Sequence, residues 1–292
     1  MVEVERLVAV RNFLGEGPLW DFREQMLYWV DINAGDLYRW NPHTNTHQVF
    51  HLGFSIGCLG LRAAGGLVMA TKQGFGTWNE KDGFKLLVNP IADKPHMRFN
   101  DGAVDPRGSF WAGTMVERRV EGHGPEGTLY RLDPDGSVHV MLTGLRIPNG
   151  MGWSLDHKTM YFTDTPDHTI YAFDYDLATG SISNRRPFVV IPETDGNPDG
   201  MTVDSEGFIW CAHWGGWKVT RHDLTGKVVA TVPVPVERPS SVAFGGVKLD
   251  ELFISTADQG ISDDELKRQP FSGALLRCRP GVTGLREFEY AG

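Results

Sequence analysis

The chain has 292 residues, a formal net charge of −9 at pH 7 and 41% hydrophobic residues. This length is ample for a buried core, and the acidic balance argues against a nucleic-acid partner and for a protein of the cytoplasm. The apolar runs are all short and the N-terminus lacks a signal-peptide pattern, so we expect no membrane span and no membrane partner.

The first part of the chain contains three short apolar segments, at residues 17–21, 26–31 and 37–42, with polar turns between them. Short strands separated by polar turns are typical of antiparallel hairpins. The same succession recurs further along the chain, beginning near Gly57, Asn100, Asn149, Asp199 and Ser241. The six units are each roughly forty to fifty residues long, a period that is typical of propellers and solenoids.

Each unit has room for four short antiparallel strands, which favours the propeller. We therefore predict an all-β fold: a six-bladed β-propeller with four-stranded antiparallel blades, in which residues 1–292 form a single domain. Residues 263–268 are the only segment expected to form one or two helical turns. We expect residues 2–10 to close the ring by pairing with the last blade beside residues 285–290.

Three cysteines, Cys58, Cys211 and Cys278, lie inside apparent strands. Their odd number and their setting predict small core residues in a reducing compartment, not a disulfide framework or a zinc site.

Four polar residues occupy nearly the same place in their units, namely Glu16, Asn100, Asn149 and Asp199. Each is expected just before the innermost strand of its blade, where equivalent positions of a radial repeat converge on the central channel. The loops between the second and third strands return to the same face. These loops are residues 31–35, 71–76, 116–127, 164–168, 213–217 and 258–262.

Glu16, Asn149 and Asp199 together suggest a metal site. Taken singly, Glu16 could be an exposed turn residue, and Asn-Gly or Asp-Gly is ordinarily a tight turn. Taken together, two buried carboxylates would repel each other unless a cation lay between them. Carboxylate and amide oxygens suit calcium, magnesium or manganese, whereas zinc would lack its preferred nitrogen and sulfur ligands. The sequence does not fix the metal.

Several motifs give the chain a family resemblance. They include Leu-Gly-Glu-Gly-Pro at residues 14–18, Arg-Phe-Asn-Asp-Gly at 98–102, Ala-Gly-Thr-Met at 112–115, and further matches at 149–150, 171–180, 182–186, 198–201, 244–246 and 268–270. The chain resembles the SMP-30/gluconolactonase/regucalcin-like family of six-bladed sugar lactonases over essentially its whole length. The resemblance implies hydrolysis of a sugar lactone to an aldonic acid, with calcium, zinc, manganese, magnesium or iron in different members.

The resemblance also implies roles for individual residues. Glu16, Asn149 and Asp199 would hold one divalent cation, and Arg98 and Asn100 would face the substrate beside it. Asn100 could also stabilise the developing oxyanion. Asp199 is sometimes cast as the general base of this family, but a metal-bound carboxylate has a depressed pKa, so we expect it to be a ligand first and a base second. For Arg98 the alternative is a surface arginine.

The chain departs from the family in the loop at residues 116–127. Relatives place an acidic residue after the Ala-Gly-Thr-Met motif, where this chain has Arg118. A guanidinium there would suit a carboxylate, phosphate or sulfonate on the substrate, although a solvated charged loop is the simpler interpretation.

The sequence leaves two other functions open beside the lactonase. One is a non-enzymatic, calcium-binding, regucalcin-like propeller, which the same ligands would serve. The other is a protein-binding propeller of the WD-repeat kind, whose Trp-Asp strand endings are missing. Residues 213–217 carry two tryptophans that could form a pocket wall or simply pack against the next blade.

Overall fold

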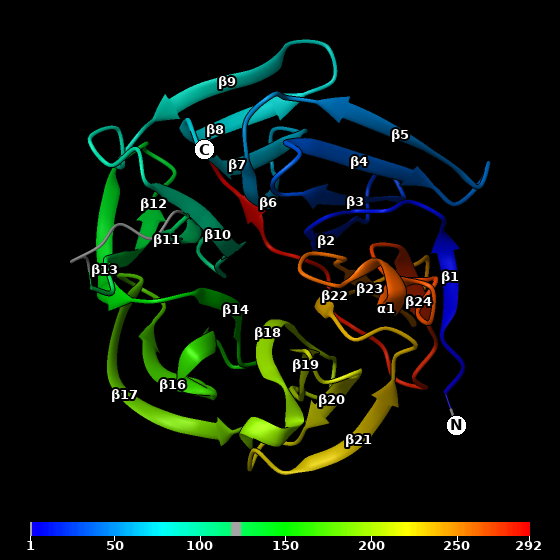
Figure 1. The fold of residues 1–292 in the computed structure, drawn as a ribbon. Coiled ribbons are helices and arrows are strands. Elements are labelled where there is room, and N and C mark those ends of the chain that lie inside the picture. The colour runs from blue at the N-terminus through cyan, green and yellow to red at the C-terminus, as the bar shows by residue number, and fades with distance from the viewer. Residues whose placement is uncertain (1, 118–123) are drawn as a thin grey trace.

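The computed structural model describes residues 2–117 and 124–292. These residues form six antiparallel sheets arranged as blades around a central axis (Figure 1). The six-bladed β-propeller with four-stranded antiparallel blades is thereby confirmed. No helix among the described residues is long and apolar enough to cross a membrane.

The strands are conveniently grouped by their distance from the axis. The innermost strands are β2 (Gly15–Asp21), β6 (Ile56–Arg62), β10 (Met97–Val104), β14 (Pro148–Trp153), β18 (Asn197–Val203) and β22 (Pro239–Gly245). The second strands are β3 (Met26–Asp31), β7 (Leu67–Thr71), β11 (Phe110–Val116), β15 (Thr159–Asp164), β19 (Ile209–Trp214) and β23 (Glu251–Thr256).

The third strands are β4 (Asp36–Asn41), β8 (Gly74–Asn79), β12 (Gly127–Leu132), β16 (Thr169–Asp176), β20 (Lys218–His222) and β24 (Leu275–Cys278). The outermost strands are β5 (Thr46–His51), β9 (Gly83–Val88), β13 (Val138–Leu145), β17 (Ser181–Val190), β21 (Val228–Pro233) and, in the last blade, β1 (Glu5–Val8). We number the blades 1 to 6 from β2 to β22.

Short helical turns occur only between strands of the described chain: η1 (Thr165–Asp167), η2 (Glu193–Asp195) and α1 (Asp263–Leu266). The predicted helical turn at 263–268 is therefore confirmed. Ser262 begins α1 with a capping box, in which its hydroxyl accepts from the Glu265 amide and the Glu265 carboxylate accepts from the Ser262 amide.

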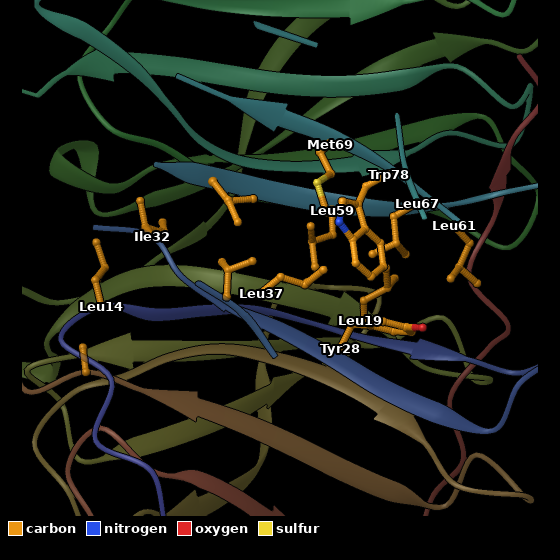
Figure 2. Close-up of a cluster of buried hydrophobic side chains, with 13 residues drawn as sticks. Leu14, Leu19, Tyr28, Ile32, Leu37, Leu59, Leu61, Leu67, Met69 and Trp78 are labelled. Atoms are coloured by element: carbon orange, nitrogen blue, oxygen red, sulfur yellow. The ribbon is translucent and has the colours of Figure 1, made fainter. Parts of the chain in front are cut away.

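Apolar side chains between neighbouring blades form the core. Between blades 1 and 2, for example, Leu19 and Tyr28 face Leu59, Leu67 and Trp78 (Figure 2). The innermost strands are buried along nearly their whole length. In the outermost strand β17, by contrast, most residues are partly or fully exposed. Two-sided burial explains why the inner strands are almost continuously apolar or glycine-rich.

A repeated turn fixes the end of the blades away from the predicted site. Asp105 accepts from the Ser109 amide at 2.8 Å and from the Trp111 indole at 2.8 Å. Asp204 makes the equivalent bonds to the Phe208 amide at 3.0 Å and to the Trp210 indole at 2.9 Å. The Asp-x-x-Gly-x-x-Trp spacing of blades 3 and 5 is therefore structural, because each buried carboxylate is satisfied by donors of its own hairpin.

The N-terminal strand closes the ring, as predicted, because β1 pairs antiparallel with β24. The prediction for residues 285–290 was wrong. Instead of lying in the last blade, the C-terminal segment leaves blade 6 and ends as β25 (Glu289–Tyr290), which pairs parallel with Leu61 and Arg62 of β6. Alternating Leu-Arg-Glu-Phe-Glu-Tyr resembles an ordinary edge strand, and nothing local to it indicates a partner in blade 2.

On its way the C-terminal segment crosses the end of the channel opposite the predicted site. Gly284 forms a bridge with Asp204 of blade 5, Phe288 packs edge-on against His157 of blade 4 at 5.4 Å, and Arg286 lies over the Phe22 ring of blade 1. The segment therefore ties together blades that are not neighbours in the ring.

Candidate functional site

The inner strands share a β-bulge that positions the predicted site residues. In every blade the inner strand carries one extra residue relative to the second strand, close to the point where their pairing begins. The bulges lie between Glu16 and Leu19, Ile56 and Cys58, Phe99 and Gly102, Asn149 and Met151, Pro198 and Met201, and Pro239 and Ser241. Bulges redirect side chains and commonly occur beside functional sites.

The four polar residues all sit at these bulges. They lie inside the inner strands, not just before them as predicted: Glu16 in β2, Asn100 in β10, Asn149 in β14 and Asp199 in β18. Each start of an inner strand pairs with the end of its second strand, for example Gly15 with Asp31 and Pro148 with Asp164. The described residues of the loops that follow the second strands consequently share this face, as expected.

Glycines beside the polar residues let the inner strands approach closely. A Cβ on Gly150 would lie 2.6 Å from the Asp199 carbonyl oxygen, and a Cβ on Gly200 would lie 2.1 Å from the Ser241 Oγ. Neither position has room for a larger residue. The glycine after Asn149 and after Asp199 therefore serves close packing at the channel as much as the turn.

Glu16, Asn149 and Asp199 are brought together in the structure. All three side chains are buried, and the Asn149 amide favours the ionised form of the Asp199 carboxyl. Burial raises the pKa of Glu16 well above its usual value, and the negative charges of Asp199 and Asp101 raise it further. Burial likewise raises the pKa of Asp199, followed by repulsion from Asp101. Two carboxylates that are hard to ionise together mark a place where a cation would be favourable.

Unpartnered oxygens point in the same direction. Asn149 Nδ2 donates to Thr165 Oγ1 at 2.9 Å, and that hydroxyl donates to the Pro198 carbonyl at 2.9 Å. This chain fixes the orientation of the amide and leaves Asn149 Oδ1 without a hydrogen-bond partner in the described residues. Asp199 Oδ1 is also without one. Buried oxygens of this kind ordinarily have a partner.

Metal-binding clusters of the commoner type are absent from the described chain. Among residues 2–117 and 124–292, no group of three or more His, Cys, Asp and Glu side chains is placed to hold a metal ion. Any cation at this end of the channel would therefore depend on the amide of Asn149 as well as on the two carboxylates.

Arg98 and Asn100 adjoin this cluster. Arg98 is 7% exposed, and its Nη1 donates to the Phe99 carbonyl at 2.8 Å and to Asn100 Oδ1 at 2.7 Å. Asn100 Nδ2 in turn donates to the Pro148 carbonyl of the next blade at 2.9 Å. Burial lowers the pKa of Arg98, and the charges of Glu117, Glu16 and Asp199 oppose that effect. Arg98 is thus a buried residue and not the surface arginine of the alternative interpretation.

Asp101 is a residue that sequence reasoning missed, although it stands in the quoted Arg-Phe-Asn-Asp-Gly motif. Burial raises its pKa to about 6, partly offset by a bond from the Gly102 amide at 2.7 Å. Its charge acts on both Glu16 and Asp199. The Asn-Asp-Gly triplet, with two polar residues before a glycine at a bulge, was the available signal.

Arg118, the predicted contact to an acidic group of the substrate, falls outside the described residues.

The loop at residues 213–217, a predicted pocket wall, is described. His213 is buried and bonded to Thr220 Oγ1 at 2.6 Å and to the Asp195 carbonyl at 2.9 Å, and burial lowers its pKa to about 4. Trp214 packs against the apolar cluster that contains Leu14 and Ala257. This part of the 213–217 loop therefore packs within its own blade and against neighbouring blades.

A cavity of about 290 Å³ occupies the channel between the candidate site and the C-terminal segment. Its lining is mostly apolar, with Asp101 at the site end and Glu287 from the C-terminal segment. Burial raises the pKa of Glu287 to about 7. Glu287 is thus a carboxyl group on the cavity wall, beside Arg286, whose charged form is disfavoured by burial.

The Glu287 carboxyl predicts a pH-dependent stability. Because its folded pKa exceeds its unfolded pKa, the folded state binds the extra proton between about pH 4.5 and 7, and stability is lost as pH rises through that window. We expect Glu287→Gln to raise the free energy of unfolding by about 2 kcal/mol more at pH 8 than at pH 4. Chemical denaturation at both pH values measures this, with the exposed Glu193→Gln as control. Equal effects of Glu287→Gln at both pH values would contradict it.

Comparison with known proteins places the chain in a family. It is 38% identical over 296 residues to regucalcin of Xenopus laevis, covering 100% of this chain and 99% of that protein. It is 40% identical over 289 residues to a pentonolactonase of Haloferax volcanii, covering 98% and 97%. The crystal structure of a calcium-binding protein, regucalcin, from Agrobacterium tumefaciens superimposes with a TM-score of 0.93 at 27% identity, over 100% of this chain and 98% of that one.

The sequence profile of the SMP-30/Gluconolactonase/LRE-like region matches residues 14–258, which contain all four polar residues of the inner strands. With full-length relatives near 40% identity and the six-bladed fold, the chain belongs to the SMP-30/gluconolactonase/LRE-like family.

Proposed function

We propose that the protein is a metal-dependent lactonase that opens sugar lactones to aldonic acids. The observation that carries this proposal is the meeting of Glu16, Asn149 and Asp199, two of which keep an unpartnered buried oxygen. Relatives named as a pentonolactonase and as regucalcins support the assignment at the level of the family.

The donor set fits one hard divalent cation. Glu16 and Asp199 would supply carboxylate oxygens and Asn149 its Oδ1, because Thr165 already occupies the Nδ2 group. Oxygen-only ligands favour calcium, magnesium or manganese, and zinc is less well served. When bound, such a cation would polarise the lactone carbonyl and lower the pKa of a bound water.

The protein side chains would orient the lactone. Arg98 Nη1 donates to the Phe99 carbonyl and to Asn100 Oδ1, and no described residue accepts a hydrogen bond from its Nε or Nη2. Those donors are available to substrate hydroxyls or to the oxygen that gains charge as water attacks. Asn100, locked by Arg98 and Pro148, has one amide hydrogen left for the same purpose. Asp199 would act as a metal ligand first and as a general base second.

We further propose that the substrate is an acidic sugar lactone, carrying a carboxylate, phosphate or sulfonate. The support is Arg118, which follows Glu117 shortly after β11, at the position where the family resemblance implies an acidic residue. A guanidinium would pair with such a group in bidentate geometry.

The Arg118 proposal predicts a selective loss. We expect Arg118→Ala to lower kcat/KM at least about tenfold for an anionic lactone, the loss of one charge-assisted contact, and to leave a neutral lactone of the same ring size unchanged. Acid release on matched neutral and anionic lactones measures both values. Equal activity of the wild type on the two lactones, or no effect of Arg118→Ala, would reject the acidic substrate.

A second candidate function is calcium binding without catalysis, which the regucalcin relatives favour. Metal analysis of the purified protein, combined with a panel of five- and six-membered aldonolactones, separates the two. A lactonase releases acid in proportion to bound metal, whereas a calcium-binding protein retains metal and leaves every lactone intact.

Cys58, Cys211 and Cys278 are free and buried. This supports the proposal of a cytoplasmic location, because unpaired thiols persist in a reducing compartment.

A further inference from the structure

Arg98 is a buried cation whose charge acts on two of the proposed metal ligands, Glu16 and Asp199. Its charge interacts with three carboxylates, Glu117 most strongly and then Glu16 and Asp199. A buried guanidinium is stable only when it is paired or well hydrogen-bonded. Glu16 and Asp199 could therefore attract Arg98 as well as a metal ion, and the two cations would compete.

When Glu16 and Asp199 bind a metal ion, Glu117 is the remaining carboxylate whose charge acts on Arg98. It directly follows β11, whose Met115 pairs with Arg98 of β10. The Glu117 amide donates to the His96 carbonyl at 2.9 Å, which fixes its backbone beside the start of β10. Its side chain is 27% exposed, so the charge lies at the edge of the site instead of inside it.

Lys72 holds Glu117 in place. From the turn after β7 in blade 2, Lys72 Nζ donates to Glu117 Oε2 at 2.8 Å, to the Pro95 carbonyl at 2.8 Å and to the Met97 carbonyl at 2.6 Å. An ammonium group has three hydrogens, and all three have an acceptor here. The contacts join blade 2 to the start of β10 and the end of β11, on both sides of Arg98.

We infer that Lys72 and Glu117 are positioning residues that hold the Arg98 guanidinium toward the substrate and away from the metal ligands. Neither residue belongs to the proposed ligand set. The inference rests on the proposed function, in which Glu16 and Asp199 hold a cation. Without Glu117, the other carboxylates that act on Arg98 are Glu16 and Asp199, and we expect the guanidinium to turn toward them.

The test compares Glu117→Gln and Lys72→Met with a matched control, Glu80→Gln, whose partner is Arg39 on β4 of blade 1. We expect both variants to weaken the affinity for calcium or manganese about tenfold, as for loss of an outer-shell partner of a metal site. KM for a neutral aldonolactone at saturating metal should rise as Arg98 leaves its place, with kcat within about twofold of the wild type. Lys72→Arg should keep most of the affinity, because a guanidinium can still pair with Glu117.

Crystal structures of the variants give a readout that does not depend on activity. We expect the Arg98–Asn100 hydrogen bond to be broken in Glu117→Gln and Lys72→Met and kept in Glu80→Gln. Intact Arg98–Asn100 bonds with unchanged metal affinity in both variants would overturn the inference. A wild type that binds metal but opens no lactone would instead reject the proposed function, while the affinities and crystal structures would still decide the role of Glu117.

Discussion

Asp199→Asn is expected to lower lactonase activity by more than about 100-fold, a larger effect than the 10- to 100-fold loss from an outer-shell partner. The substitution keeps the shape of the side chain but removes one of two buried carboxylates, whose negative charge opposes ionisation of Glu16. A neutral amide is a weaker ligand for a divalent cation than a carboxylate. Metal affinity should fall together with activity.

The same substitution should not destabilise the metal-free protein. Burial and repulsion raise the pKa of both Glu16 and Asp199, which means that their ionised forms oppose folding near neutral pH when no cation is present. Removing one charge relieves that repulsion. Thermal unfolding after chelation should give a Tm for Asp199→Asn at or above that of the wild type.

Asp195→Asn is the matched control, because Asp195 is a partly exposed carboxylate of the same blade that pairs with Lys218. It should leave activity and metal affinity unchanged. Retention of full activity by Asp199→Asn would contradict its role as a ligand. A large loss of Tm in the metal-free state would show that Asp199 is mainly a structural residue.

Tyr290→Ala is expected to lower the free energy of unfolding by about 3–5 kcal/mol, the usual cost of removing a fully buried aromatic side chain. Tyr290 is 1% exposed and packs among the side chains between blades 2 and 3. The C-terminal segment around it is also fixed by a bond from Arg62 to the Gly292 carbonyl at 3.1 Å and by an ion pair between Arg23 and Glu289 at 2.6 Å.

Tyr290→Phe separates packing from hydrogen bonding. It keeps the ring but loses the bond from the Tyr290 hydroxyl to the Asp133 carbonyl at 3.1 Å, and should cost about 1 kcal/mol. Urea denaturation of both variants measures the two effects. A cost below about 1 kcal/mol for Tyr290→Ala would mean that the C-terminal segment is dispensable for closing the far end of the channel.

The repeat was readable in the sequence because every blade must bury an inner strand and turn at both ends. Closure of the ring by residues 2–10 could be predicted from the same repeat. The position of the C-terminal segment did not, since its partners on β6 and at His157 are distant in sequence and a two-residue strand leaves no pattern. Contacts of this kind depend on the assembled ring.

At the candidate site, residue types and spacing indicated Glu16, Asn100, Asn149 and Asp199, but not how they are oriented. The bulges decide orientation, and their trace in the sequence is the glycine that follows Glu16, Asn149 and Asp199. Asp101 directly follows Asn100, and the sequence alone does not show that its charge acts on Glu16 and Asp199. Lys72 and Glu117 could not be found, because their contact joins two blades and requires carbonyl positions that only the folded backbone provides.

The most direct test of the central claim is lactone opening by one protein sample before and after removal of its metal. The rate of acid release from an aldonolactone should fall to the uncatalysed rate after chelation and dialysis. It should return in proportion to added calcium, magnesium or manganese, reaching its maximum at one ion per chain. An unchanged rate in protein shown by metal analysis to be free of divalent ions would contradict a reaction that depends on Glu16, Asn149 and Asp199 holding a cation.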